Sequence, residues 1–116
     1  MSFENMTEKE ILGIATPIMD NLMEASTNID YERHIQDFSE RMKNIVTKEH
    51  LEMVCKQYQN EKGFFSKREP IAVFKRPDSA AIIWKQWFSK AEGEFVAEIV
   101  LIKNNNRYLV DHAVVF

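Results

Sequence analysis

Three polar side chains are the strongest candidates for chemistry, because the expected strand pairing brings them onto one row of a sheet. They are Glu69, Gln86 and His112. Histidine changes protonation near neutral pH and serves as a general base, and a nearby carboxylate can assist it. If the row lines a cavity, it predicts proton transfer on a small substrate, with His112 as the base and Glu69 assisting. The alternative, which we favour, is a half-buried His112 that bonds to a helix or to water and takes no part in catalysis.

Other residues that could bind a metal or act as a nucleophile have simpler explanations. His34 and Asp37 face one way on an expected helix and His50 begins the next, but no third ligand follows at a spacing typical of metal sites. We therefore expect solvated helix residues and no metal. Cys55 lies on an apolar helical stripe, where a buried and inert thiol is the usual outcome. The three glycines form no phosphate-binding loop, so no cofactor is predicted.

Length and composition indicate a single packed domain spanning residues 1–116. Hydrophobic residues make up 45% of the chain and aromatic residues 11%, which is enough for a sizeable core. The net charge of −3 gives nucleic-acid binding no electrostatic help, so we expect no such partner. The first residues lack a signal-peptide pattern and no apolar run is long enough to span a bilayer. We therefore expect a soluble cytoplasmic protein without a membrane partner.

Three helices are predicted before the strands begin. Thr7 is followed three residues later by a glutamate, a capping-box pattern that begins the first helix. Pro17 removes one backbone donor, but the apolar stripe continues through it in phase, so we expect one kinked helix. Asp30 and Thr47 are the expected N-caps of the second and third helices, and Gly63 ends the third. The second helix carries an apolar stripe, which Ser39 can interrupt, at Tyr31, Ile35, Phe38 and Met42.

After residue 64 the hydrophobic periodicity changes from helical to extended. Four strands are expected at residues 67–76, 80–90, 94–103 and 107–116. Pro70 cannot donate to a strand ladder, so the first strand should lie at an edge or contain a bulge. The predicted fold class is α+β, with N-terminal helices packed on a curved four-stranded antiparallel sheet in a cone-shaped, cystatin-like arrangement.

The turns decide which side chains face the helices, because side chains alternate along a strand. Two-residue loops at residues 92–93 and 105–106 would place Trp84 opposite Leu101 and His112 opposite Ile99. A similar loop at residues 77–78 would place Glu69 opposite Gln86. The bulkier and less charged row is assigned to the interior. From it and the facing helix we predict a ligand-binding set of Tyr31, Phe38, Trp84, Gln86 and His112.

The opposite face of the predicted sheet carries apolar side chains that a monomer should leave polar. Contiguous apolar area rimmed by charge usually marks an interface. A two-fold dimer formed sheet against sheet is the simplest way to cover it. The predicted dimer interface comprises Lys85, Trp87, Val96, Glu98, Val100 and Leu109.

The segment at residues 28–32, Asn-Ile-Asp-Tyr-Glu, followed by Ile35 and Phe38, resembles the helix-loop-helix of the nuclear transport factor 2-like superfamily. The order of helices and strands along most of the chain is similar as well. The resemblance implies a cone-shaped α+β fold, which hosts isomerases, dehydratases, epoxide hydrolases and transport factors. In the steroid-isomerase branch a tyrosine of the first helix takes part in catalysis. Here no tyrosine lies between Thr7 and Ser26, so those roles are not carried over.

Three functions are therefore kept open. The first is a small homodimeric domain whose cone cavity binds a small apolar ligand without catalysis. The second is a cofactor-free lyase or isomerase that uses a cavity histidine and glutamate. The third is a protein-interaction module that binds another chain through the outer sheet face. An enzyme needs an open cavity, so the space between helices and sheet distinguishes the first two.

Overall fold

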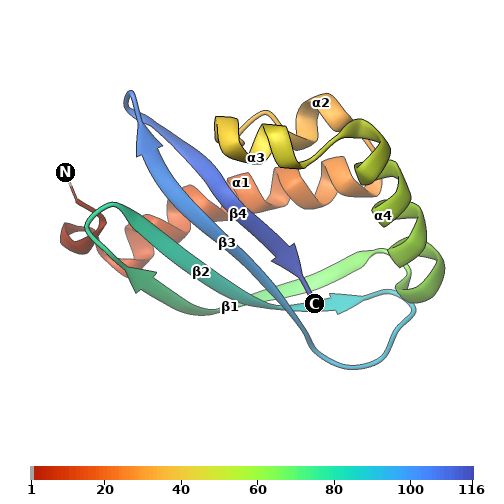
Figure 1. The fold of residues 1–116 in the computed structure, drawn as a ribbon. Coiled ribbons are helices and arrows are strands. Elements are labelled where there is room, and N and C mark those ends of the chain that lie inside the picture. Colours follow the sequence, from red (N-terminus) through yellow and green to blue (C-terminus); the bar gives the residue numbers. More distant parts are fainter. Residues whose placement is uncertain (1) are drawn as a thin grey trace.

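The computed structural model describes residues 2–116 as helices gathered on one side of a twisted antiparallel sheet (Figure 1). The helices are the 3-10 helix Phe3–Asn5, α1 (Glu8–Thr27), α2 (Tyr31–His34), α3 (Glu40–Ile45) and α4 (Lys48–Lys62). The strands are β1 (Phe65–Lys75), β2 (Ser79–Phe88), β3 (Phe95–Asn104) and β4 (Arg107–Val115). They pair in the order β1-β2-β3-β4, so the predicted α+β class with a four-stranded antiparallel sheet is confirmed.

Helix α1 begins at the predicted capping box. The Thr7 hydroxyl accepts from the Glu10 N–H at 3.1 Å, and the Glu10 carboxylate accepts from the Thr7 N–H at 2.9 Å. This reciprocal pair satisfies two backbone donors that the helix itself leaves free. The helix then continues past Pro17 to Thr27, so the prediction of one helix is confirmed.

The predicted second helix is divided in two. Asp30 caps α2 as expected, but α2 ends at His34 and Ser39 caps a separate helix, α3. The residues between them reach the sheet instead. The Val110 N–H donates to the Asp37 carbonyl at 2.7 Å, and the Ser39 N–H donates to the Val110 carbonyl at 2.9 Å. This parallel bridge ties the helical layer to the free edge of β4.

The core lies between α1 and the inner face of the sheet. Ile11 and Met19 of α1 are fully buried there, and Trp84 of β2 is 2% exposed. Gln86 is also fully buried, on the predicted face. Its amide nitrogen donates to the carbonyl oxygens of Lys67 and Trp87, while its side-chain oxygen has no partner. Gln86 therefore braces β1 against β2 from within the core.

The β2–β3 loop is longer than predicted, yet the two strands keep their predicted faces. Trp84 pairs with Ala97 rather than with Leu101. Because this slip is even, no side chain of β2 or β3 changes face. The predicted turn at Asn105 and Asn106 is present, with φ angles of 51° and 61°.

A bulge in β1 changes the predicted position of one site residue, Glu69. Pro70 pairs with Trp84 and Ala72 pairs with Ile83, which leaves Ile71 as an extra residue. The predicted edge strand with an irregularity at Pro70 is thus confirmed. The bulge shifts Glu69 opposite Lys85, onto the outer face, so its predicted position opposite Gln86 is wrong.

A second bulge, in β4, changes the predicted position of His112. Leu101 pairs with Val110 as predicted, but Val100 pairs with His112, which leaves Asp111 as an extra residue. The bulge turns His112 to the outer face, where it is exposed, so its predicted interior position is wrong. The Asp111 carboxylate accepts from the Ser39 hydroxyl at 2.7 Å and from the Arg41 side chain at 3.2 Å. These bonds lower the pKa of Asp111 and hold the extra residue against the helices.

Substitution of Gly63 should destabilise the fold. Gly63 has φ 85° and ψ −149°, and a Cβ there would lie 2.4 Å from the Ser89 hydroxyl oxygen. We expect Gly63→Ala to lower the free energy of unfolding by roughly 1–3 kcal/mol, measured by urea denaturation followed by circular dichroism. The control is Gly13→Ala in α1, where a Cβ meets nothing within 4 Å. That change should stabilise by roughly 0.5–1 kcal/mol. Equal urea midpoints for Gly63→Ala and the unsubstituted chain would show that the backbone at this position tolerates a side chain.

Candidate functional site

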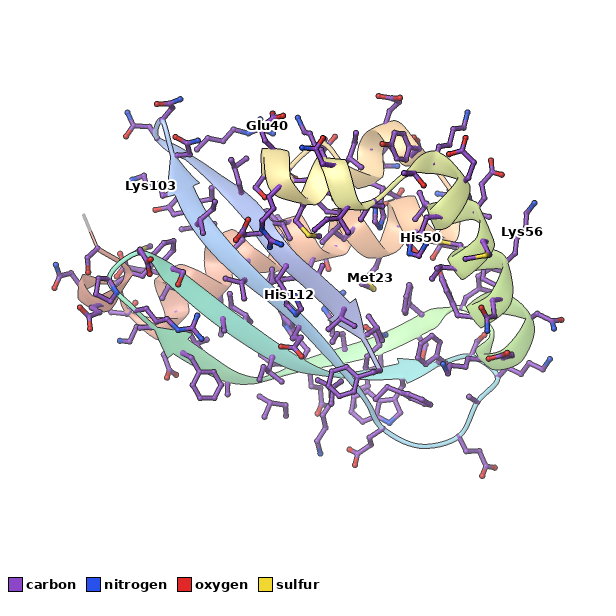
Figure 2. All side chains as sticks on the ribbon, in the orientation of Figure 1. Met23, Glu40, His50, Lys56, Lys103 and His112 are labelled. Carbon is purple, nitrogen blue, oxygen red and sulfur yellow. The ribbon has the colours of Figure 1, made fainter. Side chains whose placement is uncertain are left out.

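A cavity of about 420 Å³ opens between the helices and the C-terminal part of the sheet. Side chains from α1 to α4 and from β1, β2 and β4 form its wall, and most of them are apolar. They include Met19, Leu22, Met23, Phe38, Met42, Leu51, Phe65, Phe88, Ala113 and Val115. Figure 1 shows α4 standing beside the end of β4 rather than on top of it, and Figure 2 shows Met23 and His50 next to this opening. The cavity thus has an apolar wall and an open side.

Helical periodicity places the wall residues of α1 and α4 on the sides of these helices that face each other. Leu51, Cys55 and Tyr58 recur along one face of α4, and the same spacing brings Met19 and Ser26 of α1 toward them. On the sheet, the bulge in β4 replaces a histidine at the inner position with a small alanine, Ala113. A small side chain therefore lies on the sheet side of the space where α4 and β4 separate.

A buried polar cluster connects α1 with α4 at the cavity wall. The Ser26 hydroxyl oxygen lies 3.2 Å from the Cys55 sulfur and 2.8 Å from the Tyr58 hydroxyl oxygen. Burial raises the pKa of the Cys55 thiol and also that of the Tyr58 phenol. Both groups are therefore protonated at pH 7, and the cluster offers neither a thiolate nucleophile nor a phenolate base.

His34 is a cavity residue that sequence reasoning missed. It ends α2 and packs edge-on against Phe38, with ring centroids 5.3 Å apart. Its Nδ1 atom is buried without a hydrogen-bond partner. Burial lowers the pKa of His34 to about 4, so the ring is neutral at pH 7. The spacing of one helical turn between His34 and the apolar Phe38 was the signal that could have placed it inside.

The residues predicted to bind a ligand do not gather in one place. Phe38 lines the cavity, whereas Trp84 and Gln86 lie in the core outside its wall. The Tyr31 hydroxyl donates to the Val46 carbonyl at 3.2 Å and ties α2 to the segment between α3 and α4. His112 is on the outer face, with its Nε2 3.8 Å from a Glu98 carboxylate oxygen. Figure 2 places it on β4, away from the helical layer.

The predicted catalytic pair is separated from the cavity. Glu69 forms an exposed ion pair with Lys67 at 2.8 Å, and this hydrogen bond lowers the pKa of Glu69. Neither Glu69 nor His112 lines the cavity wall. No group of three His, Cys, Asp or Glu side chains within residues 2–116 is arranged to bind a metal ion.

The outer face of the sheet is partly apolar, and no helix of the described chain covers it (Figure 1). Phe74 and Ile71 of β1 are 52% and 55% exposed. The Lys67 ammonium lies over the Trp87 ring at 5.2 Å, and Lys85 pairs with Glu94 at 2.7 Å. The side chains of the predicted interface are all partly exposed on this face: Lys85, Trp87, Val96, Glu98, Val100 and Leu109.

Comparison with known proteins supports the fold and nothing finer. The sequence matches no protein-family model and no curated protein. The fold is similar to the solution structure of RPA3114, a SEC-C motif containing protein from Rhodopseudomonas palustris. That match has a TM-score of 0.61 and 10% identity, and it covers 84% of this chain and 74% of that one. Such low identity shows a shared fold only.

Two further structures are similar. Bd1075 from Bdellovibrio bacteriovorus matches with a TM-score of 0.53 and 13% identity over 89% of this chain, but the match spans only 39% of Bd1075. A DUF4783 family protein from Bacteroides ovatus matches with a TM-score of 0.49 and 14% identity, covering 82% of this chain and 90% of that one. Within residues 2–116 no helix is long and apolar enough to cross a membrane.

Stability should fall between pH 7 and pH 5 because of His34. An unfolded histidine gains its proton below about pH 6.5, whereas His34 in the fold does so only near pH 4. The unfolded state therefore binds more protons between these values, and the free energy of unfolding falls by about 2 kcal/mol through this residue. Urea denaturation at both pH values should show this fall reduced in His34→Gln and retained in His50→Gln. An unchanged pH dependence in His34→Gln would refute it.

Proposed function

We propose that this chain is a small-ligand-binding domain of the nuclear transport factor 2-like type, whose cavity takes a small apolar molecule. The observation that supports this proposal is the cavity of about 420 Å³. Its volume falls within the roughly 300–1,000 Å³ of ligand pockets, which are typically apolar with a few polar groups. Here the wall is mostly apolar, and its polar groups include the Ser26 cluster and His34.

The groups in the cavity favour binding over the alternative of a lyase or isomerase. A general base works best when its pKa lies near the working pH. His34, with a pKa of about 4, is a weak base, and Cys55 and Tyr58 hold their protons at pH 7. The residues predicted for catalysis, Glu69 and His112, lie on the outer face of the sheet.

Filling the cavity should weaken binding. We expect the uncharged dye N-phenyl-1-naphthylamine to bind the unsubstituted chain with increased fluorescence. Ala113→Leu extends a side chain into the cavity from β4 and should weaken the affinity at least about tenfold, because well-packed space does not admit both groups. Fluorescence titration measures the dissociation constant.

The matched control is Ala91→Leu, which adds the same side chain in the β2–β3 loop outside the cavity wall. It should bind the dye like the unsubstituted chain. The absence of dye binding by a folded unsubstituted chain, or equal affinities for both variants, would rule out the cavity as a binding site.

A second proposal concerns the outer face of the sheet, which we infer to be covered by a second copy of this chain. The exposed Phe74 and Ile71 extend the predicted apolar surface around Trp87 to the edge of the sheet. Exposed apolar area of this kind usually marks an interface, and a two-fold axis lets one patch cover itself. A different protein could cover the same face instead. The oligomeric state of the chain distinguishes the two alternatives.

Introducing a charge on this face should dissociate the dimer. We expect a dimer for the unsubstituted chain in sedimentation velocity at micromolar concentration. Trp87→Glu should give a monomer with an unchanged circular dichroism spectrum, because a buried unpaired carboxylate opposes association. Met53→Glu, at a position 60% exposed on α4, is the control and should remain dimeric. A monomeric unsubstituted chain would instead support a different partner.

A further inference from the structure

His34 holds a hydrogen-bonding capacity that the described chain does not use. No side-chain hydrogen bond within residues 2–116 involves its ring. The ring lies in the cavity wall, with Nδ1 buried and without a partner. The other ring nitrogen, Nε2, is not among the buried unpartnered atoms, so a bound molecule can reach it.

The surroundings of the ring indicate where its proton lies. A neutral imidazole has one N–H donor and one acceptor nitrogen. Buried N–H groups without an acceptor are rarer in proteins than under-satisfied acceptors, and they lose a full hydrogen bond. A proton on Nδ1 would create such an orphaned donor. The favoured tautomer therefore carries its proton on Nε2, the nitrogen of this cavity-lining ring that a bound molecule can reach.

The buried hydroxyl and thiol groups of the wall bond to one another. The Ser26 hydroxyl is shared between Cys55 and Tyr58. The exposed His50, Gln57 and Glu61 belong to the solvated rim. The partly exposed Lys62 also lines the cavity, with its ammonium 5.9 Å from the centre of the Phe88 ring. His34 is thus an uncharged polar group of this wall with a donor to offer.

We propose that the natural ligand is an uncharged apolar molecule with a hydrogen-bond acceptor, most simply a carbonyl oxygen, which receives the Nε2–H of His34. This inference rests on the proposed binding function and adds the chemistry that selects the ligand. An uncharged acceptor fits because the neutral His34 ring and the apolar side chains around it would not compensate a charged group for its lost hydration. The hydrogen bond would fix the orientation of a ligand that the apolar wall holds only by shape.

The test compares two probes that differ only in the acceptor. 1-Acetylnaphthalene and 1-ethylnaphthalene have nearly the same shape, but only the first has a carbonyl oxygen. Their dissociation constants are measured by displacement of N-phenyl-1-naphthylamine from the unsubstituted chain and from His34→Phe. We expect the preference for the ketone over the hydrocarbon to fall roughly three- to tenfold in His34→Phe. His34→Gln keeps an N–H donor and should retain part of this preference.

The outcomes separate this inference from the function on which it rests. If both probes bind the unsubstituted chain and the preference is unchanged in His34→Phe, the inference is wrong and the binding function stands. If neither probe binds, the binding function fails and takes the inference with it. Should His34→Phe not fold, His34→Leu removes the same donor with a smaller side chain and gives the same comparison.

A second measurement reads the tautomer directly. A long-range ¹H–¹⁵N spectrum at pH 7 should show the His34 ring protonated on Nε2, with the Nδ1 shift of an unprotonated nitrogen. A ring protonated on Nδ1 would overturn the inference, because no donor would then face the cavity.

Discussion

The extra residue in β4 is the constraint on which the cavity depends. Val110, just before Asp111, points into the core. After Asp111, Ala113 is the residue that faces inward. The bulge persists because Asp111 is held by Ser39 and Arg41, which belong to the helical layer. Without this anchor the strand would continue in phase and put an imidazole where a methyl group now borders the cavity. One ion-paired carboxylate thus sets which side chain of β4 borders the cavity.

The two faces of the sheet follow different rules. The inner face packs against α1 with fully buried side chains such as Trp84, and the outer face mixes apolar side chains with exposed ion pairs. The molecule measures 42 × 30 × 17 Å along its principal axes, so it is only two layers thick. Such a plate has too little depth to bury both faces of its own sheet, which leaves Trp87 and its neighbours available to another surface.

Features that depend on neighbouring residues could be predicted from the sequence, whereas those that depend on distant contacts could not. The capping pattern at Thr7, the edge signal of Pro70 and the helix end at Gly63 are local and were predicted correctly. The bulge that moves His112 outward depends on Asp111 contacting residues about 70 positions earlier in the chain. The alternation of apolar and polar residues along the strand does not indicate this contact. His34 was missed although its spacing of one helical turn from Phe38, against which it packs, gave a local signal.

The bridge between residues 37–39 and Val110 has a consequence for the order in which the protein assembles. A growing polypeptide leaves the ribosome with α1 and α2 first and β4 last. The helical segments that border the cavity therefore emerge long before the strand that fastens them, and loop closure over such a separation is slow. During synthesis these segments expose apolar side chains until β4 has been made, so the pocket forms only after the sheet is complete.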